Sequence, residues 1–228
     1  MERSRLNEPV NLDKVQKTWY VKSLKMLGQE ITKENAREIF DNVAFIVFNY
    51  DRCIEQFLRY GLRFLYGLPE KEAEDICDDL QLIHPYGYVA DLPMQGKSPG
   101  GVPFGDHDYG SDHVGLAENI RTYTEQILDA DLSSRIHAEM LSAGNIVFLG
   151  FAFHPQNMHL LTPEEKLGPK TIFGTAYGMS DDDIQTITGQ LFGMFRDPSN
   201  MMAMKRVKLN NKLTCADLFD YYARSLTA

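Results

Sequence analysis

The chain has 228 residues, 43% of them hydrophobic, and a formal net charge of −9 at pH 7. This length and composition allow a buried core, and the negative charge argues against nucleic acid as a direct partner. The sequence has no run of about 20 apolar residues and no apolar signal segment, so neither a membrane partner nor secretion is expected. The 3 cysteines are scattered, which predicts neither a disulfide framework nor a zinc site and favours the cytoplasm.

Two helices are predicted before the first strand. Apolar residues recur at near-helical spacing over residues 14–27, and Gly28 follows this segment. Ile31 and Thr32 have the positions of a hydrophobic staple and an N-cap for a second helix, which ends at Phe40.

Residues 43–48 are predicted to form a strand that is buried on both faces, because they are almost all β-branched or aromatic. The polar segment Asn49-Tyr50-Asp51-Arg52 ends this strand, and Asp51 is expected to cap the helix that follows. Arg52 is expected to pair with Asp51, with a phosphate as the alternative partner. One apolar stripe defines the helix: Ile54, Phe57, Leu58, Leu62 and Leu65.

A second strand is predicted at residues 80–89 (LQLIHPYGYV), ending in a turn. Residues 90–115 are rich in glycine and proline and are expected to form a long surface loop, a kind of segment that often binds ligands. Within it, residues 106–113 (DHDYGSDH) carry several metal-ligating side chains. Their spacing matches no coordination motif, so an ordinary polar loop is favoured. Helices are predicted at residues 116–128 and 132–141.

Further elements are predicted in the second half of the chain: strands at residues 146–151 (IVFLGF), 171–175 and 207–209, and a helix at 214–226. Apolar strands alternating with helices predict an α/β fold with a doubly wound, mostly parallel, Rossmann-like sheet and helices on both faces. A single domain is expected over residues 1–228, with a loop excursion at about 90–115. Ligands bind beyond the carboxyl ends of such strands, where Asn49 and Asp51 lie.

Three short segments together resemble the sirtuin-like NAD-binding fold. These are FNYDR after the first buried strand, LIHPYG in the second, and IVFLGF followed by HPQN. The sequence is most similar to the divergent bacterial branch, which is often met in phage-defence and NAD-depleting proteins. The similarity covers roughly residues 40–180, and the order and spacing of the segments make it more specific than any one of them.

The resemblance implies an NAD-binding and NAD-hydrolysing domain that releases nicotinamide. It places Asn49 at the ribose or the attacking water beside the nicotinamide, and His84 at the ribose hydroxyls as base or orienter. The other residues that it assigns to the dinucleotide are Asp51, Arg52, Gly87, Gly150 and Phe151. The implied partner is NAD or an ADP-ribose-type ligand, and assembly into a homo-oligomer or a larger protein complex stays open.

The residue types suit this chemistry. An amide such as that of Asn49 orients a water without quenching an oxocarbenium-like centre, and the imidazole of His84 carries a proton near neutral pH. The structural alternatives are an Asn49 that caps the helix and a His84 that bonds to backbone in a turn before Pro85. Cys53 is expected to be a buried structural thiol rather than a nucleophile.

Two features of sirtuin-like enzymes are missing from the sequence. No glycine-rich GAGxS turn, which binds the pyrophosphate through backbone N–H groups, precedes Asn49. The 3 cysteines cannot form the four-cysteine zinc module of the deacylases, so protein deacylation is not expected. The chain is therefore expected to be a fragment of a longer protein or a degenerate relative. A catalytically silent module that serves protein–protein interaction is the alternative function.

Overall fold

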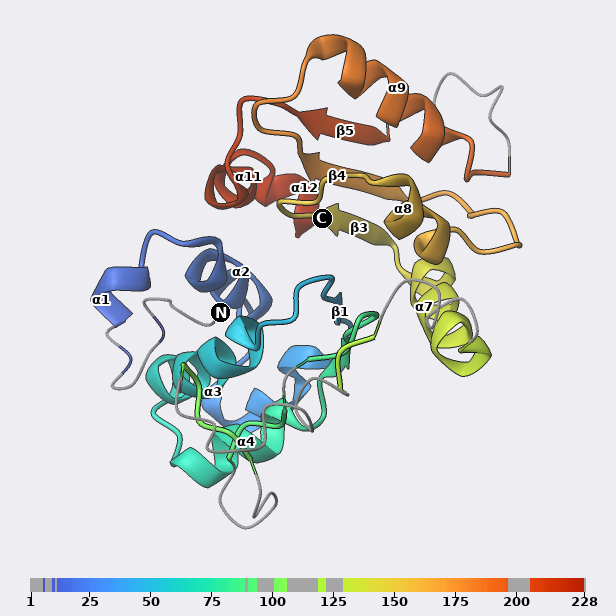
Figure 1. The fold of residues 1–228 in the computed structure, drawn as a ribbon. Coiled ribbons are helices and arrows are strands. Elements are labelled where there is room, and N and C mark those ends of the chain that lie inside the picture. The colour runs from blue at the N-terminus through green and yellow to red at the C-terminus, as the bar shows by residue number, and fades with distance from the viewer. Residues whose placement is uncertain are drawn as a thin grey trace. The chain divides into compact units, whose positions relative to one another are not determined.

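The computed structural model describes residues 6, 10, 12–88, 90–93, 101–105, 119–121, 129–196 and 206–227. The chain divides into two compact units, residues 1–126 and 127–228, and each is described by itself (Figure 1). Both units combine helices with parallel strands, which confirms the predicted α/β class. The single domain stays a prediction. In the described part of the chain, no helix is both long and apolar enough to cross a membrane.

The first unit contains a two-stranded parallel sheet. β1 (Ala44–Ile46) pairs with β2 (Gln81–Ile83), with Ala44 opposite Gln81 and Ile46 opposite Ile83. The chain passes from β1 to β2 through two helices, α3 (Cys53–Tyr66) and α4 (Glu70–Cys77). Before β1 come α1 (Leu12–Val15), α2 (Trp19–Leu27) and a 3-10 helix, η1 (Lys33–Phe40).

Helix α3 forms the centre of the first unit's core. Phe57, Leu58 and Leu62 are buried along its predicted apolar stripe and belong to one cluster with side chains of α2, η1 and α4. On the same helix, the buried Arg59 donates to Glu74 of α4 at 2.6 Å. Because α3 is fixed by this packing, its first turn is held beside the ends of β1 and β2.

The second unit contains a three-stranded parallel sheet in the order β3-β4-β5. The strands are β3 (Asn145–Phe148), β4 (Thr171–Thr175) and β5 (Val207–Asn210). The helices are α7 (Ala130–Ser142), α8 (Pro155–Leu161), α9 (Asp181–Phe192), α11 (Cys215–Tyr221) and α12 (Ala223–Leu226). Ile172 and Phe173 of the central strand are fully buried, as expected for a strand covered on both faces.

β1, β2 and β3 are shorter than predicted, whereas β4 has the predicted bounds and β5 extends one residue beyond the predicted 207–209. The strands expected in one sheet lie in two. β2 ends at Ile83 rather than at residue 89, because Pro85 lacks an N–H group and Gly87 takes a left-handed φ of 72°. β3 ends at Phe148 rather than at 151, because Gly150 and Phe153 also have positive φ values, 59° and 53°. The turns that end the strands therefore begin within the predicted strand segments.

The helices differ from the predictions in several places, and the helix predicted over residues 14–27 is divided into α1 and α2. α4, α8 and α9 were not predicted, and the predicted helix at 214–226 is interrupted at Tyr222, whose φ and ψ are −104° and 14°. η1 is a 3-10 helix, although Thr32 forms the predicted N-terminal cap with Asn35. The polar segment 106–113 and almost all of the helix predicted at 116–128 lie outside the described residues.

Candidate active site

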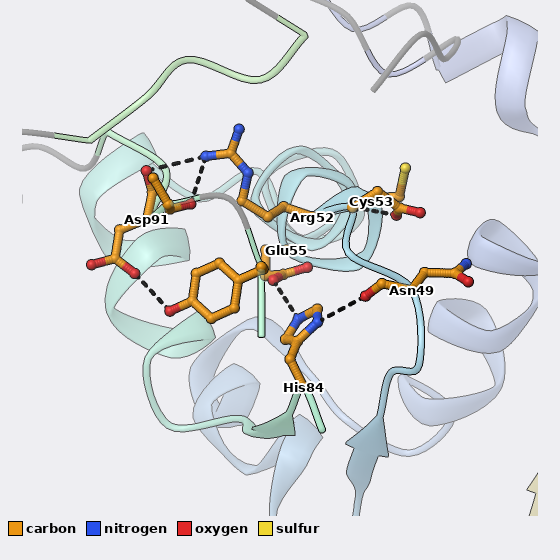
Figure 2. Close-up of polar contacts among 9 residues, drawn as sticks. Asn49, Arg52, Cys53, Glu55, His84 and Asp91 are labelled. Atoms are coloured by element: carbon orange, nitrogen blue, oxygen red, sulfur yellow. Dashed lines mark hydrogen bonds and ion pairs between the residues drawn. The ribbon is translucent and has the colours of Figure 1, made fainter. Parts of the chain in front are cut away.

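The segment after β1 and the turn after β2 meet at the carboxyl end of the first sheet. The two strands are parallel and in register, and Val47 N donates to the carbonyl of Ile83 at 2.8 Å just beyond the paired residues. His84 Nδ1 then lies 3.2 Å from the backbone oxygen of Asn49 (Figure 2). The two residues that the sequence singled out are therefore brought together by the pairing of β1 with β2.

The contact between these residues uses the main chain of Asn49 and not its amide. Asn49 is exposed, and Figure 2 shows its side chain pointing away from the imidazole. Asp51, two residues on, accepts a hydrogen bond at 3.1 Å from the backbone N–H of Cys53, the first residue of α3. Arg52, and not Asp51 as predicted, occupies the N-cap position. The amide of Asn49 therefore stays available to a ligand.

Glu55, which the sequence did not indicate as a site residue, is the second partner of the imidazole. His84 Nε2 lies 2.9 Å from Glu55 Oε1, and the histidine side chain is only 3% exposed. The other carboxylate oxygen, Oε2, is buried and has no partner among the described residues. One feature of the sequence could have indicated Glu55 as a site residue. It is an acidic residue in the first turn of a helix that begins at the carboxyl end of a buried strand.

The partners of His84 restrict where its protons lie. A backbone carbonyl only accepts, so Nδ1 carries a hydrogen when it bonds to Asn49. Nε2 faces a carboxylate, so either the imidazole is doubly protonated or Glu55 carries the proton and donates it to Nε2. The histidine and Glu55 thus share one proton between them, which is the arrangement expected of a group that transfers protons.

The guanidinium of Arg52 is buried, with the whole residue 1% exposed. Nη1 donates to the carbonyls of Ala90 at 2.8 Å, Asp91 at 3.1 Å and Val102 at 2.8 Å. Nη2 lies 3.5 Å from the carbonyl oxygen of Pro103. The guanidinium therefore binds the carbonyls of the loop at residues 90–91 and 102–103. A dinucleotide phosphate would have to displace these carbonyls to reach it.

Gly87 is required by the packing of the chain itself. Its φ is 72°, and a Cβ placed on it would lie 1.9 Å from the carbonyl oxygen of Asn119. Gly87 and Ile120 form an isolated antiparallel bridge, and Arg121 N donates to Tyr86 O at 3.0 Å. The space that the missing side chain leaves is thus filled by residues 119–121 of the same unit.

Gly150 and Phe151 lie in the second unit, after β3. Gly150 N donates to Thr175 Oγ1 at 2.9 Å, which links the ends of β3 and β4. The ring of Phe151 packs with those of Phe148 and Phe153, with centroids 5.2 Å apart in each pair. Since the two units are described separately, one cleft shared by these residues and Asn49 stays a prediction.

Two tyrosines that the sequence did not indicate lie near the site. The ring of Tyr88 is 4.9 Å from that of His84, and its hydroxyl donates to Asp91 Oδ1 at 2.7 Å. Burial, followed by the hydrogen bond to Asp91, raises the pKa of Tyr88 to about 12. Burial also raises the pKa of Tyr20, with smaller contributions from Cys53 and Asp51. Both hydroxyls are therefore neutral donors at physiological pH.

The described residues contain no group of three or more histidine, cysteine, aspartate or glutamate side chains placed to hold a metal ion. Cys53, Cys77 and Cys215 are free thiols. The expectation that zinc is absent stays a prediction, and the segment 106–113 lies outside the described residues.

No protein-family model matches this chain, and no curated protein or solved structure matches it either.

Proposed function

We propose that the first unit carries the nicotinamide-ribose end of an NAD-hydrolysing site, with His84 as the proton carrier. The observation that carries the proposal is the imidazole held at the carboxyl ends of two paired parallel strands, between the Asn49 carbonyl and the Glu55 carboxylate. Ligands of parallel α/β sheets bind at this edge. The sequence resemblance to sirtuin-like domains supplies the identity of the ligand.

The polar groups of the site suit a ligand that donates hydroxyl hydrogens. A buried acceptor without a partner costs about 1–3 kcal/mol, and Glu55 Oε2 is such an acceptor among the described residues. The Asn49 carbonyl is a second acceptor beside the same imidazole. The vicinal hydroxyls of a ribose present two donors at short spacing, so one sugar ring satisfies both acceptors if the buried Glu55 Oε2 becomes accessible when the ligand binds.

The proposed reaction converts NAD and water into ADP-ribose and nicotinamide with release of one proton. The bond between the ribose C1′ and nicotinamide breaks, nicotinamide leaves with the bonding electron pair, and the water oxygen bonds to C1′. In the observed contacts Nδ1 carries a hydrogen towards the Asn49 carbonyl. After this hydrogen is lost to solvent, Glu55 holds the Nε2–H group of the neutral ring, and Nδ1 takes the proton of the water or of a ribose hydroxyl. This step requires the ring to release the Asn49 carbonyl. The exposed amide of Asn49 orients the attacking water.

Release of nicotinamide from NAD tests the proposal. General acid–base catalysis contributes roughly 10²–10⁴-fold, so His84→Gln is expected to lower the rate at least about 100-fold. Asn49→Ala and Glu55→Gln are expected to lower it as well. His159→Gln is the control, because this exposed histidine lies on α8 of the second unit. NAD is also expected to raise the melting temperature, since a ligand that binds the folded state stabilises it.

A role without turnover is the second candidate, and one observation favours it. His84 is 3% exposed and bonded through both ring nitrogens, so it also serves as a structural link between β2, α3 and the segment after β1. If millimolar NAD neither stabilises the protein nor yields nicotinamide, the enzymatic proposal fails and the interaction module is left. If His159→Gln lowers release as much as His84→Gln, the assignment of the proton carrier fails.

A further inference from the structure

Arg52 is a buried cation that binds only to main chain in the contacts described above. Burying a guanidinium is costly unless its N–H groups find acceptors. Its acceptors come from two stretches of the glycine- and proline-rich loop, residues 90–91 and 102–103. The stretches also bind each other directly, because Val102 N donates to Asp91 O at 2.9 Å. Arg52 therefore fixes both stretches to the start of α3.

From Asp91 the contacts continue to the imidazole. The carbonyl of Asp91 binds Arg52, and its carboxylate accepts a hydrogen bond from the Tyr88 hydroxyl at 2.7 Å. The Tyr88 ring packs on His84 with 4.9 Å between centroids and 48° between planes. Each contact in this series restrains the next side chain.

We infer that Arg52 is a positioning residue for His84, which it holds in place through Asp91 and Tyr88. Asn49 and Glu55 fix the two nitrogens of the imidazole, and Tyr88 lies against the ring itself. Arg52 lies between Asn49 and Glu55 in the sequence, so one short segment supplies both nitrogen partners and the anchor of the ring contact. The catalytic meaning of this positioning rests on the proposed function.

The inference is tested by NMR on the whole chain with ¹³C-labelled histidine. The chain has 6 histidines, and His84→Gln identifies the signal of His84 by its loss. Tyr88→Leu removes the aromatic ring and so measures the full ring-current shift that Tyr88 imposes on the imidazole protons. Arg52→Met and Tyr88→Phe are then compared with this reference. Tyr88→Phe removes only the hydroxyl, so it provides a test even if Arg52→Met does not fold.

The matched control is Arg59→Met. Arg59 is a buried arginine within α3, and its ion pair is with Glu74 of α4. It controls for a general loosening of α3, because its substitution also removes a buried guanidinium and leaves the acceptor that it bound without a donor.

Arg52→Met and Tyr88→Phe are each expected to lose a large part of the ring-current shift, whereas Arg59→Met keeps it. The double variant Arg52→Met/Tyr88→Phe is expected to lose no more than the larger single loss, since both changes break one series of contacts. An unchanged His84 signal in Tyr88→Phe, or an equal loss in Arg59→Met, would overturn the inference.

Kinetics separates this inference from the proposed function. Arg52→Met is expected to lower kcat for nicotinamide release with little change in KM, because the proton carrier is displaced while the ligand groups stay. If the wild-type chain releases no nicotinamide but the NMR shifts change as expected, the proposed function fails and the positioning of His84 stands. If nicotinamide is released and kcat is unchanged in Arg52→Met, the catalytic part of the inference fails.

Discussion

The imidazole of His84 has a partner on each ring nitrogen, so a substitution there acts on stability as well as on chemistry. Removing it leaves the Asn49 carbonyl and Glu55 Oε1 without their bonds. A buried group that loses its partner costs about 1–3 kcal/mol. This cost applies to the part-buried contact with Glu55, whereas water can replace the exposed contact with Asn49. Activities of His84 variants are therefore to be expressed per folded molecule, with the folded fraction measured by denaturation in the same buffer.

At the same scale, Cys77 is expected to be a poorly reactive thiol. Burial raises its pKa from 9.0 to about 12, and the thiolate is the species that reacts. In a variant with Cys53→Ser and Cys215→Ser, alkylation of Cys77 at about pH 8 is expected to be at least about 100-fold slower in native protein than in urea. Equal rates in the two states would show that the thiol is accessible and ionised in the folded chain.

At the scale of elements, the turn after β2 depends on Gly87. A left-handed backbone conformation costs an alanine about 1–2 kcal/mol. Gly87→Ala is expected to destabilise the first unit by more than this. The excess comes from the Asn119 carbonyl, 1.9 Å from the added Cβ. The matched control is Gly67→Ala, at φ 64° with no atom within 4 Å of the added Cβ. Urea denaturation measures both, and equal losses would contradict the close approach of Asn119.

The start of α9 depends on a capping box. Ser180 Oγ accepts from Asp183 N at 3.1 Å, and the Asp183 carboxylate accepts from the Ser180 hydroxyl at 2.7 Å. Ser180→Ala is expected to cost about 0.5–2 kcal/mol. Ser142→Ala, at the last residue of α7 where the exposed hydroxyl donates to Glu139 O, is expected to change the free energy of unfolding much less. Similar losses in the two variants would mean that the box contributes nothing particular to α9.

The sequence predicts where the main elements of this fold begin better than where they end. The stripe of Phe57, Leu58 and Leu62 and the apolar strands are visible from residue type alone, because burial dictates their composition. The ends of β2 and β3 depend on positive φ values at Gly87, Gly150 and Phe153. Pro85 and the glycines indicate a turn, but the residue at which each strand ends also depends on tertiary contacts such as the approach of Asn119 to Gly87.

The same distinction holds for the candidate site. The convergence of Asn49 and His84 follows from parallel pairing of two apolar strands, which the sequence predicts. The contact between Glu55 and His84, and the burial of Arg52 among carbonyls, depend on the rotation of α3 and the path of the loop. A charged residue at the start of a helix is usually solvated, so its sequence position alone does not indicate a buried role.

At the scale of the whole molecule, stability is expected to fall at alkaline pH. Burial raises the pKa of Cys77 and of Tyr88 to about 12 each, from their ordinary values of 9.0 and 10.0. The unfolded chain therefore loses these protons at lower pH than the folded chain. The stabilisation of the folded state by these two raised pKa values is complete below about pH 9 and is lost as pH rises towards 12.

The free energy of unfolding, measured in urea at a series of pH values, checks this expectation. For Cys77→Ala, the free energy of unfolding is expected to fall less steeply above pH 9 than it does for the wild-type chain, because one of the contributing protons is gone. Tyr88→Phe is likewise expected to make the free energy of unfolding fall less steeply with pH above pH 10. A free energy that rises over this range, or variants with the wild-type slope, would contradict the assignment.

The way in which Arg52 holds the loop affects which loop sequences the fold can accept. Its acceptors at residues 90, 91, 102 and 103 are all main-chain oxygens, and every amino acid supplies one. The attachment therefore places no demand on the side chains at Ala90, Val102 and Pro103, and these positions can diversify while the loop stays anchored. A protein built in this way can alter the surface beside its site by mutation without redesigning the support beneath it.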